Sequence, residues 1–354
     1  MERDRSKKPH LTPAPRSLSR PVAEPSGELA LLRHIRSRVS AANLSLTLGI
    51  GDDCALIRVR PGEEIAVTTD LSIAGRHFNL AWHPPQAIGH RVLARGLSDL
   101  AAMGARPVAA FLSLGVPANL VQKVKGIRWV DRFYDGLLAL AAKHKVPLAG
   151  GDLAQSPIAA ADIVLLGAVR RGKALLRSGA RPGDLIYVTG NLGAAATGFA
   201  KLKALARSRR PTGHSGLTVP PTLKEVLERQ LYPHPRIAQG LRLIGRATAA
   251  IDLSDGLSTD LAHLCQESGV AAEIDASGLP ISEGATLDQA LHGGEDYELL
   301  FTASPTTRIP GAIAGVQVTQ IGAVTKCPAR GPAVTLATPH GRRPLEPNGW
   351  QHFA

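Results

Sequence analysis

The chain has 354 residues, of which 44% are apolar and 4% aromatic, and this is long enough for two domains with cores of their own. Its three cysteines, Cys54, Cys265 and Cys327, are too few and too scattered for a disulfide framework, so we expect a reducing, cytoplasmic location. No apolar run approaches the roughly 18 residues that a membrane-spanning helix needs, which excludes an integral membrane protein of the helical kind.

The formal net charge of +12 raises the question of a nucleic-acid partner. Residues 1–20 contain six Lys or Arg and two acidic residues, a net charge of +4, among prolines and serines. Such a composition cannot bury a core, so we expect residues 1–26 to form a disordered basic tail. The tail lacks aromatic residues for stacking on bases, so we do not expect nucleic acid as a partner. An organellar transit peptide stays open as an alternative.

The first half of the chain alternates between helical and strand-like patterns. Apolar spacing predicts a helix over 28–39 and strands over 54–59 and 65–69, and a longer helix over 85–103 that ends at Gly104. A strand over 108–116, a helix over 121–143, a short strand over 146–148 and a strand over 162–169 follow. This alternation is typical of an α/β or α+β fold.

The turn at 179–184 indicates the start of a second half. There the pattern predicts a strand over 185–189, an Ala-rich helix to 206, a helix over 235–247, a strand over 249–253, a helix over 257–267 and a strand over 297–302. The Ser-, Arg-, Gly- and Pro-rich stretch 207–221 is expected to be a mobile loop. We therefore expect two domains, over 27–171 and 172–354.

Two neighbouring carboxylates, Asp52 and Asp53, follow a glycine turn, and Asp70 closes the next apolar run. Adjacent acids repel each other, so a fold that keeps them together usually places a cation between them. The alternative is an ordinary polar turn, in which Asp bonds the local backbone and Gly supplies a positive φ.

Further acids recur beside Gly, Ser or Thr at the ends of expected elements: Asp99, Asp152, Asp252, Asp255 and Glu295. Because the ends of consecutive elements in layered α/β folds tend to share one rim, these carboxylates are expected to converge. Oxygen ligands of this kind suit Mg²⁺ rather than Zn²⁺, and Mg²⁺ held by carboxylates usually takes substrate phosphates as further ligands. The pattern thus favours phosphoryl transfer. The chain has no P-loop motif, so metal ions would have to bind the phosphates in place of the backbone amides and the lysine of a P-loop.

Several blocks, in their order along the chain, resemble thiamine-monophosphate kinase. They are Gly49–Leu56, Thr68–Asp70, Gly75–Phe78, Leu97–Ala105, Gly150–Asp152, Arg177–Asp184, Ile251–Gly256 and Gly293–Leu299. The resemblance spans roughly residues 27–353. It implies an aminoimidazole-ribonucleotide-synthetase-like fold, in which an N-terminal α/β domain dimerises through its sheet and a C-terminal α/β domain completes the active site.

The resemblance also implies ATP-dependent phosphorylation of thiamine monophosphate to thiamine diphosphate, the last step in making that cofactor, by a homodimer that uses several Mg²⁺ ions. By position, the implied metal residues are Asp53, Thr68, Thr69, Asp70, Asp99, Asp152, Asp252 and Asp255. The implied nucleotide residues are Gly151, Asp152, Arg177 and Ser254, and the implied substrate residues are His77, Glu295 and Trp350. Asp52 belongs to the motif as a supporting residue.

Each of these residues also has an ordinary structural interpretation. Ser254 and Asp255 suit a helix N-cap, His77 a loop, Trp350 a terminal core position and Arg177 the surface. The chain also departs from the family at Leu153, since members usually continue Gly-Gly-Asp with threonines. Aminoimidazole-ribonucleotide synthetase is the nearest enzymatic rival, and a nucleotide sensor or an RNA-binding module is the alternative from another class. The expected reactive cysteines of selenophosphate synthetase and of hydrogenase-maturation proteins are missing.

Overall fold

The computed structural model describes residues 28–39, 45–50, 53–122, 128–208, 224–328 and 333–350. The chain divides into two compact units, Met1–Arg38 and Val39–Ala354. In the first unit, α1 (Glu28–Arg38) confirms the predicted helix. The expected basic tail, Asp52, and most of the expected loop over 207–221 lie outside the described residues.

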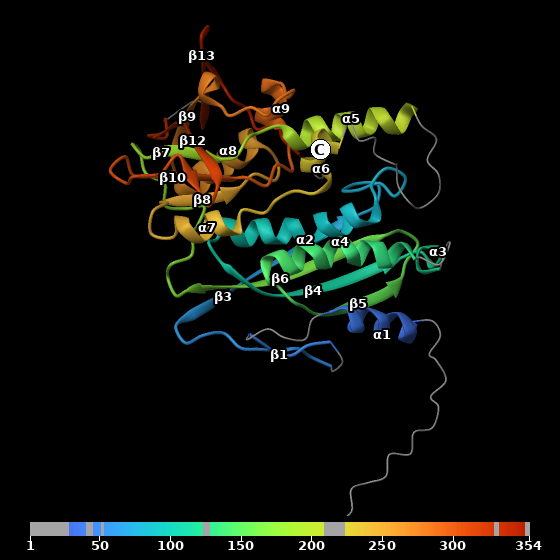
Figure 1. Cartoon of the computed structure of the whole chain (residues 1–354). Coiled ribbons are helices and arrows are strands. Elements are labelled where there is room, and N and C mark those ends of the chain that lie inside the picture. The colour runs from blue at the N-terminus through green and yellow to red at the C-terminus, as the bar shows by residue number, and fades with distance from the viewer. Residues whose placement is uncertain are drawn as a thin grey trace, which may run out of the picture. The chain divides into compact units, whose positions relative to one another are not determined.

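The second unit contains a four-stranded sheet in the order β3–β6–β4–β5 (Figure 1). Its strands are β3 (Glu63–Ile73), β6 (Ala160–Arg170), β4 (Arg106–Val116) and β5 (Leu148–Gln155). The pairs β3/β6 and β4/β6 are antiparallel, and β4/β5 is parallel. The short strands β1 (Leu46–Leu48) and β2 (Leu56–Ile57) form a separate antiparallel pair.

Three helices accompany this sheet: α2 (Pro85–Ala102), α3 (Ala118–Val121) and α4 (Trp129–His144). Helix α2 packs on β3 and β6, and α4 packs along α2 (Figure 1). The two helices approach closely because glycines face backbone at their contact. A Cβ at Gly89 would lie 1.9 Å from the carbonyl oxygen of Phe133, and one at Gly136 would lie 1.8 Å from that of Gln86.

The second sheet follows the order β14–β13–β9–β12–β7–β10–β8, with β11 paired to β12. Its strands are β7 (Leu185–Thr189), β8 (Ala249–Asp252), β9 (Ala271–Asp275), β10 (Leu299–Ala303), β11 (Ala312–Ile313), β12 (Val316–Thr325), β13 (Val334–Thr338) and β14 (Gly341–Pro344). Its helices are α5 (Ala194–Ser208), α6 (Lys224–Leu231), α7 (Ile237–Leu243), α8 (Leu257–Ser268) and α9 (Leu287–His292), and Ala276–Gly278 forms a 3₁₀ turn. Only β13/β9 is parallel among the pairs of the described strands of this sheet.

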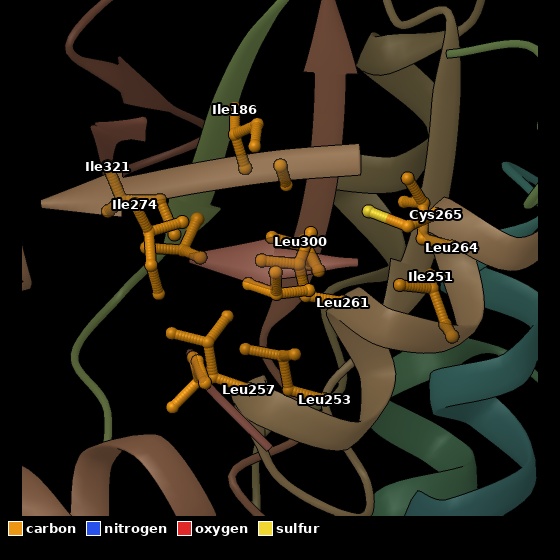
Figure 2. Close-up of a cluster of buried hydrophobic side chains, with 14 of the residues drawn as sticks. Ile186, Ile251, Leu253, Leu257, Leu261, Leu264, Cys265, Ile274, Leu300 and Ile321 are labelled. Carbon is orange, nitrogen blue, oxygen red and sulfur yellow. The ribbon is translucent and has the colours of Figure 1, made fainter. Parts of the chain in front are cut away.

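Helix α8 forms much of the core beneath this sheet. Leu257, Leu261 and Leu264 recur at helical spacing and are buried against the strands, where Ile274 and Leu300 meet them (Figure 2). Burying a leucine side chain contributes roughly 1.5–3 kcal/mol, so this stripe fixes how α8 begins relative to β8. The loop that joins β8 to α8 is thereby held in place.

Helix α2 also contacts α7 and β8, so it lies between elements of the two sheets. A Cβ at Gly240 of α7 would lie 1.9 Å from the carbonyl oxygen of Ala101, which shows how closely the two helices approach. Burial on both sides explains why α2 shows few charges. The charges that it does have are therefore informative about the site.

The structure corrects some sequence expectations. The short strand expected over 146–148 is instead β5, which runs to Gln155, so Gly151 and Asp152 lie within an edge strand rather than after a strand. The single helix expected over 121–143 is α3 followed by α4, which begins at Trp129. The expected division between 171 and 172 stays a prediction, although the two sheets lie on either side of it in sequence.

Candidate active site

A cavity of about 560 Å³ lies where α2, β3, α5, α6 and the loops around β8 and β10 meet. Its lining includes many of the residues that the sequence singled out: Asp70, His77, Asp99, Asp252, Ser254, Asp255, Glu295 and Trp350. These residues are up to 280 positions apart in the chain (350 minus 70) and come from both sheets. The cavity therefore brings together the acids of the expected rim.

Asp252, at the end of β8, is the most buried of the acids that line the cavity. Its side chain accepts a hydrogen bond from Ser98 of α2, with 2.7 Å between Oγ and Oδ2. Burial, and then the nearby carboxylate of Asp99, raise the pKa of Asp252 to about 7. A carboxyl group in this position resists ionisation unless positive charge lies close to it.

Asp99 faces Asp252 from α2. Burial raises the pKa of Asp99, and a hydrogen bond from the Thr68 hydroxyl to its Oδ2 opposes that rise. The carboxylate of Asp70 raises the pKa further, while Arg177 lowers it. Asp70 is itself paired with Arg95, whose Nε lies 2.8 Å from Asp70 Oδ1. Three carboxylates from β3, α2 and β8 thus influence one another electrostatically.

This set of oxygen donors fits Mg²⁺ chemically. No group of three or more His, Cys, Asp or Glu side chains within the described ranges is arranged to hold a metal ion by itself. Mg²⁺ commonly binds through one or two carboxylates and completes its shell with water and substrate phosphates. The convergence of Asp70, Asp99 and Asp252 on one cavity is the observation that favours a cation here, since a cation would offset their repulsion.

Glu295, in the loop between α9 and β10, also lines the cavity. Glu295 has a left-handed backbone with φ of 68°, which is unusual for a residue with a side chain. Arg91 of α2 donates to Glu295 Oε1 at 2.5 Å, and Gln230 of α6 donates to Oε2 at 3.4 Å. Burial raises the pKa of Glu295, but Arg91, Arg95, the hydrogen bond from Gln230 and His83 together lower it by more, so the group stays ionised.

Three aromatic residues line the cavity, of which Tyr297 is buried and Trp350 and Phe199 are exposed. Trp350 is 45% exposed, and its backbone N–H donates to the carbonyl oxygen of Asp255 at 3.1 Å. Phe199 of α5 is 41% exposed and contacts Trp82, with 6.4 Å between ring centroids. The sequence analysis missed Phe199. An aromatic residue on an Ala-rich helix that follows a glycine loop was the available signal.

Other predicted residues do not line the cavity: Asp53, Thr68, Thr69, Gly151, Asp152 and Arg177. The Thr68 hydroxyl donates a hydrogen bond to Asp99, which does line the cavity. Arg177 lowers the pKa of Asp99 and of Asp252 through its positive charge. Thr69 is exposed on the other face of β3, because neighbouring residues of a strand point to opposite sides. Asp152 and Asp53 are exposed as well. The metal and nucleotide roles of these residues stay predictions.

Comparison with known proteins places the chain in a class. A family model for AIR synthase related protein, N-terminal domain, matches residues 51–169, and one for the C-terminal domain matches residues 181–331. The chain has the two-domain, mixed α/β fold of AIR-synthase-related proteins.

Individual relatives narrow this further. The thiamine-monophosphate kinase of Salmonella typhimurium is 39% identical over 310 residues, which cover 85% of this chain and 89% of the relative. The crystal structure of thiamine-monophosphate kinase from Stenotrophomonas maltophilia matches with a TM-score of 0.75 and 37% identity over 87% of this chain and 96% of that one. AaThiL complexed with AMPPCP and TMP matches with a TM-score of 0.70 and 31% identity, covering 92% of this chain and 97% of that one. The chain belongs to the thiamine-monophosphate kinase family.

Proposed function

We propose that this chain transfers the γ-phosphoryl group of ATP to thiamine monophosphate and so makes thiamine diphosphate. The observation that supports this most directly is the shared cavity, whose lining includes Asp70, Asp99, Asp252, Glu295 and Trp350. Its volume of about 560 Å³ suits a small molecule of this class. The relative AaThiL, complexed with AMPPCP, an ATP analogue, and TMP, binds the same pair of ligand types.

The reaction brings two phosphorylated, mutually repelling substrates together. A phosphate oxygen of thiamine monophosphate attacks the γ-phosphorus of ATP, the bond between that phosphorus and the β,γ-bridging oxygen breaks, and ADP leaves with the electron pair. Bound Mg²⁺ supplies positive charge that reduces repulsion between the phosphates. Asp70, Asp99 and Asp252 would hold that metal, and Asp255 lines the same cavity.

The other residues orient the substrates. Arg76, His77 and Arg95 line the cavity and give the phosphates hydrogen-bond donors. Trp350 covers a ring face, where a cationic thiazolium or a flat pyrimidine is stabilised by cation–π or stacking contact. Ser254 and Arg177 are proposed for the nucleotide, together with Gly151 and Asp152.

A homodimer is the proposed assembly. The face of β3 that points away from α2 exposes Ile65, Val67 and Leu71, and Val67 is 62% exposed. The residues paired with Val67 and Thr69 on β6 are Leu166 and Val164, so the apolar surface continues onto the next strand. A contiguous apolar sheet face of this kind indicates a protein contact, and a second copy of the chain would cover it.

The proposed location is the cytoplasm. Cys54, Cys265 and Cys327 are all free thiols, as expected in a reducing compartment. No helix in the described ranges has the length and apolar character to cross a bilayer. Nucleic acid is not proposed as a partner.

The test is an assay of the purified chain with ATP, MgCl₂ and thiamine monophosphate, which follows ADP and thiamine diphosphate together. We expect equimolar formation of both products, and no product when EDTA replaces MgCl₂. The control omits thiamine monophosphate and measures ATP hydrolysis alone. ADP formation without thiamine diphosphate, or turnover that is unchanged in EDTA, would contradict the proposal.

A further inference from the structure

The last described residues, 345–350, run from the second sheet to the cavity. Leu345, which follows β14, is buried, and its backbone N–H donates to the carbonyl oxygen of Val334 at 3.0 Å. Residues 346–348 are exposed. Gly349 and Trp350 then belong to the lining of the cavity. The attachment of the chain at residues 349 and 350 therefore helps to place the Trp350 side chain.

Two backbone hydrogen bonds attach this segment to the start of α8. The N–H of Gly349 donates to Oγ1 of Thr259 at 3.0 Å, and the N–H of Trp350 donates to the carbonyl oxygen of Asp255 at 3.1 Å. Thr259 lies in the first turn of α8 and is 4% exposed. Of these two acceptors, the Thr259 hydroxyl is the one that belongs to a side chain, so it is the one that a substitution can remove.

A glycine at position 349 allows the segment to come this close to α8. A Cβ there would lie 2.1 Å from the carbonyl oxygen of Asp255 and 2.5 Å from Oγ1 of Thr259. Both distances are far below van der Waals contact, so a larger residue would push the segment away. The two oxygens in the way are the same ones that accept the hydrogen bonds. Gly349 and Thr259 therefore serve one contact.

The two acceptors are themselves held in place. Asp260, which is 2% exposed, accepts hydrogen bonds from the backbone N–H groups of Asp255 and Gly256 at 3.1 and 3.0 Å. Helix α8 is fixed in the core by its leucine stripe. A rigid acceptor positions the group that is bound to it, so the segment is oriented before a ligand binds.

We propose that Thr259 is a positioning residue, whose hydroxyl holds residues 349 and 350 so that Trp350 covers a ring of bound thiamine monophosphate. This inference rests on the proposed function. Trp350 is 45% exposed and lines the cavity, so a ligand there can reach its indole. Thr259 is not among the described residues of the lining, so it acts through Trp350 and not on the substrate. Stacking and cation–π contacts depend on the position of the ring, so a loosened attachment weakens them.

The test is a double-mutant cycle on the full-length protein. Titration calorimetry would measure the Kd of thiamine monophosphate in MgCl₂ and saturating AMPPCP, which prevents turnover. The variants are Thr259→Val, which keeps the shape of the side chain and removes the acceptor, Trp350→Ala, and the two combined. We expect Thr259→Val to raise the Kd about twofold to tenfold, the effect of one hydrogen bond. In the Trp350→Ala background the same substitution should cause no further rise, because the group that it positions is absent.

An equal rise in both backgrounds would overturn the proposal, because Thr259 would then affect the substrate without Trp350. Thr259→Ser keeps the acceptor and should bind as the wild type does, and a rise as large as that of Thr259→Val would also count against the proposal. Thr302→Val is the matched control. Thr302 is fully buried on β10, its hydroxyl lies 2.7 Å from that of Thr248, and it is outside the described lining. The control should lower stability and keep the wild-type Kd.

Gly349→Ala keeps the proposal falsifiable if Thr259→Val does not fold. Its Cβ would displace the segment from α8, so we expect the Kd to approach that of Trp350→Ala, with no further rise when the two substitutions are combined. A wild-type Kd in Gly349→Ala would overturn the proposal. The product assay tests the proposed function separately. Formation of thiamine diphosphate by the wild type, together with a wild-type Kd in Trp350→Ala, would overturn this inference and leave the proposed function intact.

Discussion

At the scale of single residues, the site contains side chains of two kinds. Asp70, Asp99 and Asp252 are recognisable in the sequence, because each carboxylate stands beside small or hydroxyl-bearing residues at or near the end of an apolar run. Arg91 and Gln230 are not recognisable in this way. Arg91 reaches the carbonyl oxygen of Gln230 across 139 positions of sequence, so only tertiary packing brings them together.

Trp350→Ala tests the substrate side of the cavity. Loss of an exposed aromatic face that covers a cationic ring costs about 0.5–2 kcal/mol, so we expect the KM for thiamine monophosphate to rise roughly twofold to thirtyfold. The KM for ATP should change little. Steady-state kinetics with each substrate varied in turn would measure both. Leu241→Ala, which removes an exposed apolar side chain outside the cavity lining, is the control. Equal effects on the two KM values would remove the role assigned to Trp350.

At the scale of elements, α2 is the part on which the site depends most. It presents Asp99, Arg91 and Arg95 to the cavity region while its other faces pack on the first sheet, α4 and α7. The apolar periodicity of residues 85–103 predicted this helix, and the structure ends it at Ala102. Periodicity did not identify β9, β13 or α6, because short strands and an eight-residue helix offer too few repeats to establish a period.

Gly89→Ala tests the contact between α2 and α4. Alanine is intrinsically favoured over glycine inside a helix by about 1 kcal/mol. Here its Cβ would lie 1.9 Å from the carbonyl oxygen of Phe133, so the helices must separate and the overlap should outweigh that gain. We expect a net destabilisation of about 1–3 kcal/mol in urea unfolding. Gly311→Ala is the control, since a Cβ there meets nothing within 4 Å. A Gly89→Ala protein as stable as the control would contradict the packing described.

At the scale of the whole molecule, buried acids and buried histidines have opposite effects on stability. Burial raises the pKa of Asp252 and Asp296 to about 7 and that of Asp260 to about 8. Unfolded aspartates titrate near about 3.9, so the folded state retains protons that the unfolded state has lost, and stability falls as pH rises through the folded pKa values. Burial lowers the pKa to about 4 for four histidines: His83, His90, His144 and His234. Their contribution is lost as pH falls below about 6.5.

The prediction is that the metal-free protein is most stable near pH 6.5 and loses stability between pH 6.5 and 8, where the three acids titrate without opposition from the histidines. Thermal unfolding in EDTA across pH 5–9 would measure this. Asp260→Asn keeps an acceptor for the backbone N–H groups of Asp255 and Gly256, so it should fold and reduce the loss above pH 6.5. A melting temperature that rises steadily from pH 6.5 to pH 8 would contradict this account.

The most direct test of the central claim is the Mg²⁺ dependence of turnover in Asp99→Asn. Asparagine keeps the size of the side chain and an acceptor for Thr68, so the variant should fold. Its melting temperature should equal or exceed that of the wild type, because asparagine is neutral and its burial does not desolvate a carboxylate as the burial of Asp99 does. Loss of one carboxylate from the group Asp70, Asp99 and Asp252 should lower kcat/KM at limiting MgCl₂ by at least about a hundredfold. Partial recovery at high MgCl₂ is the expected companion result. Wild-type rates at limiting MgCl₂ would contradict the account.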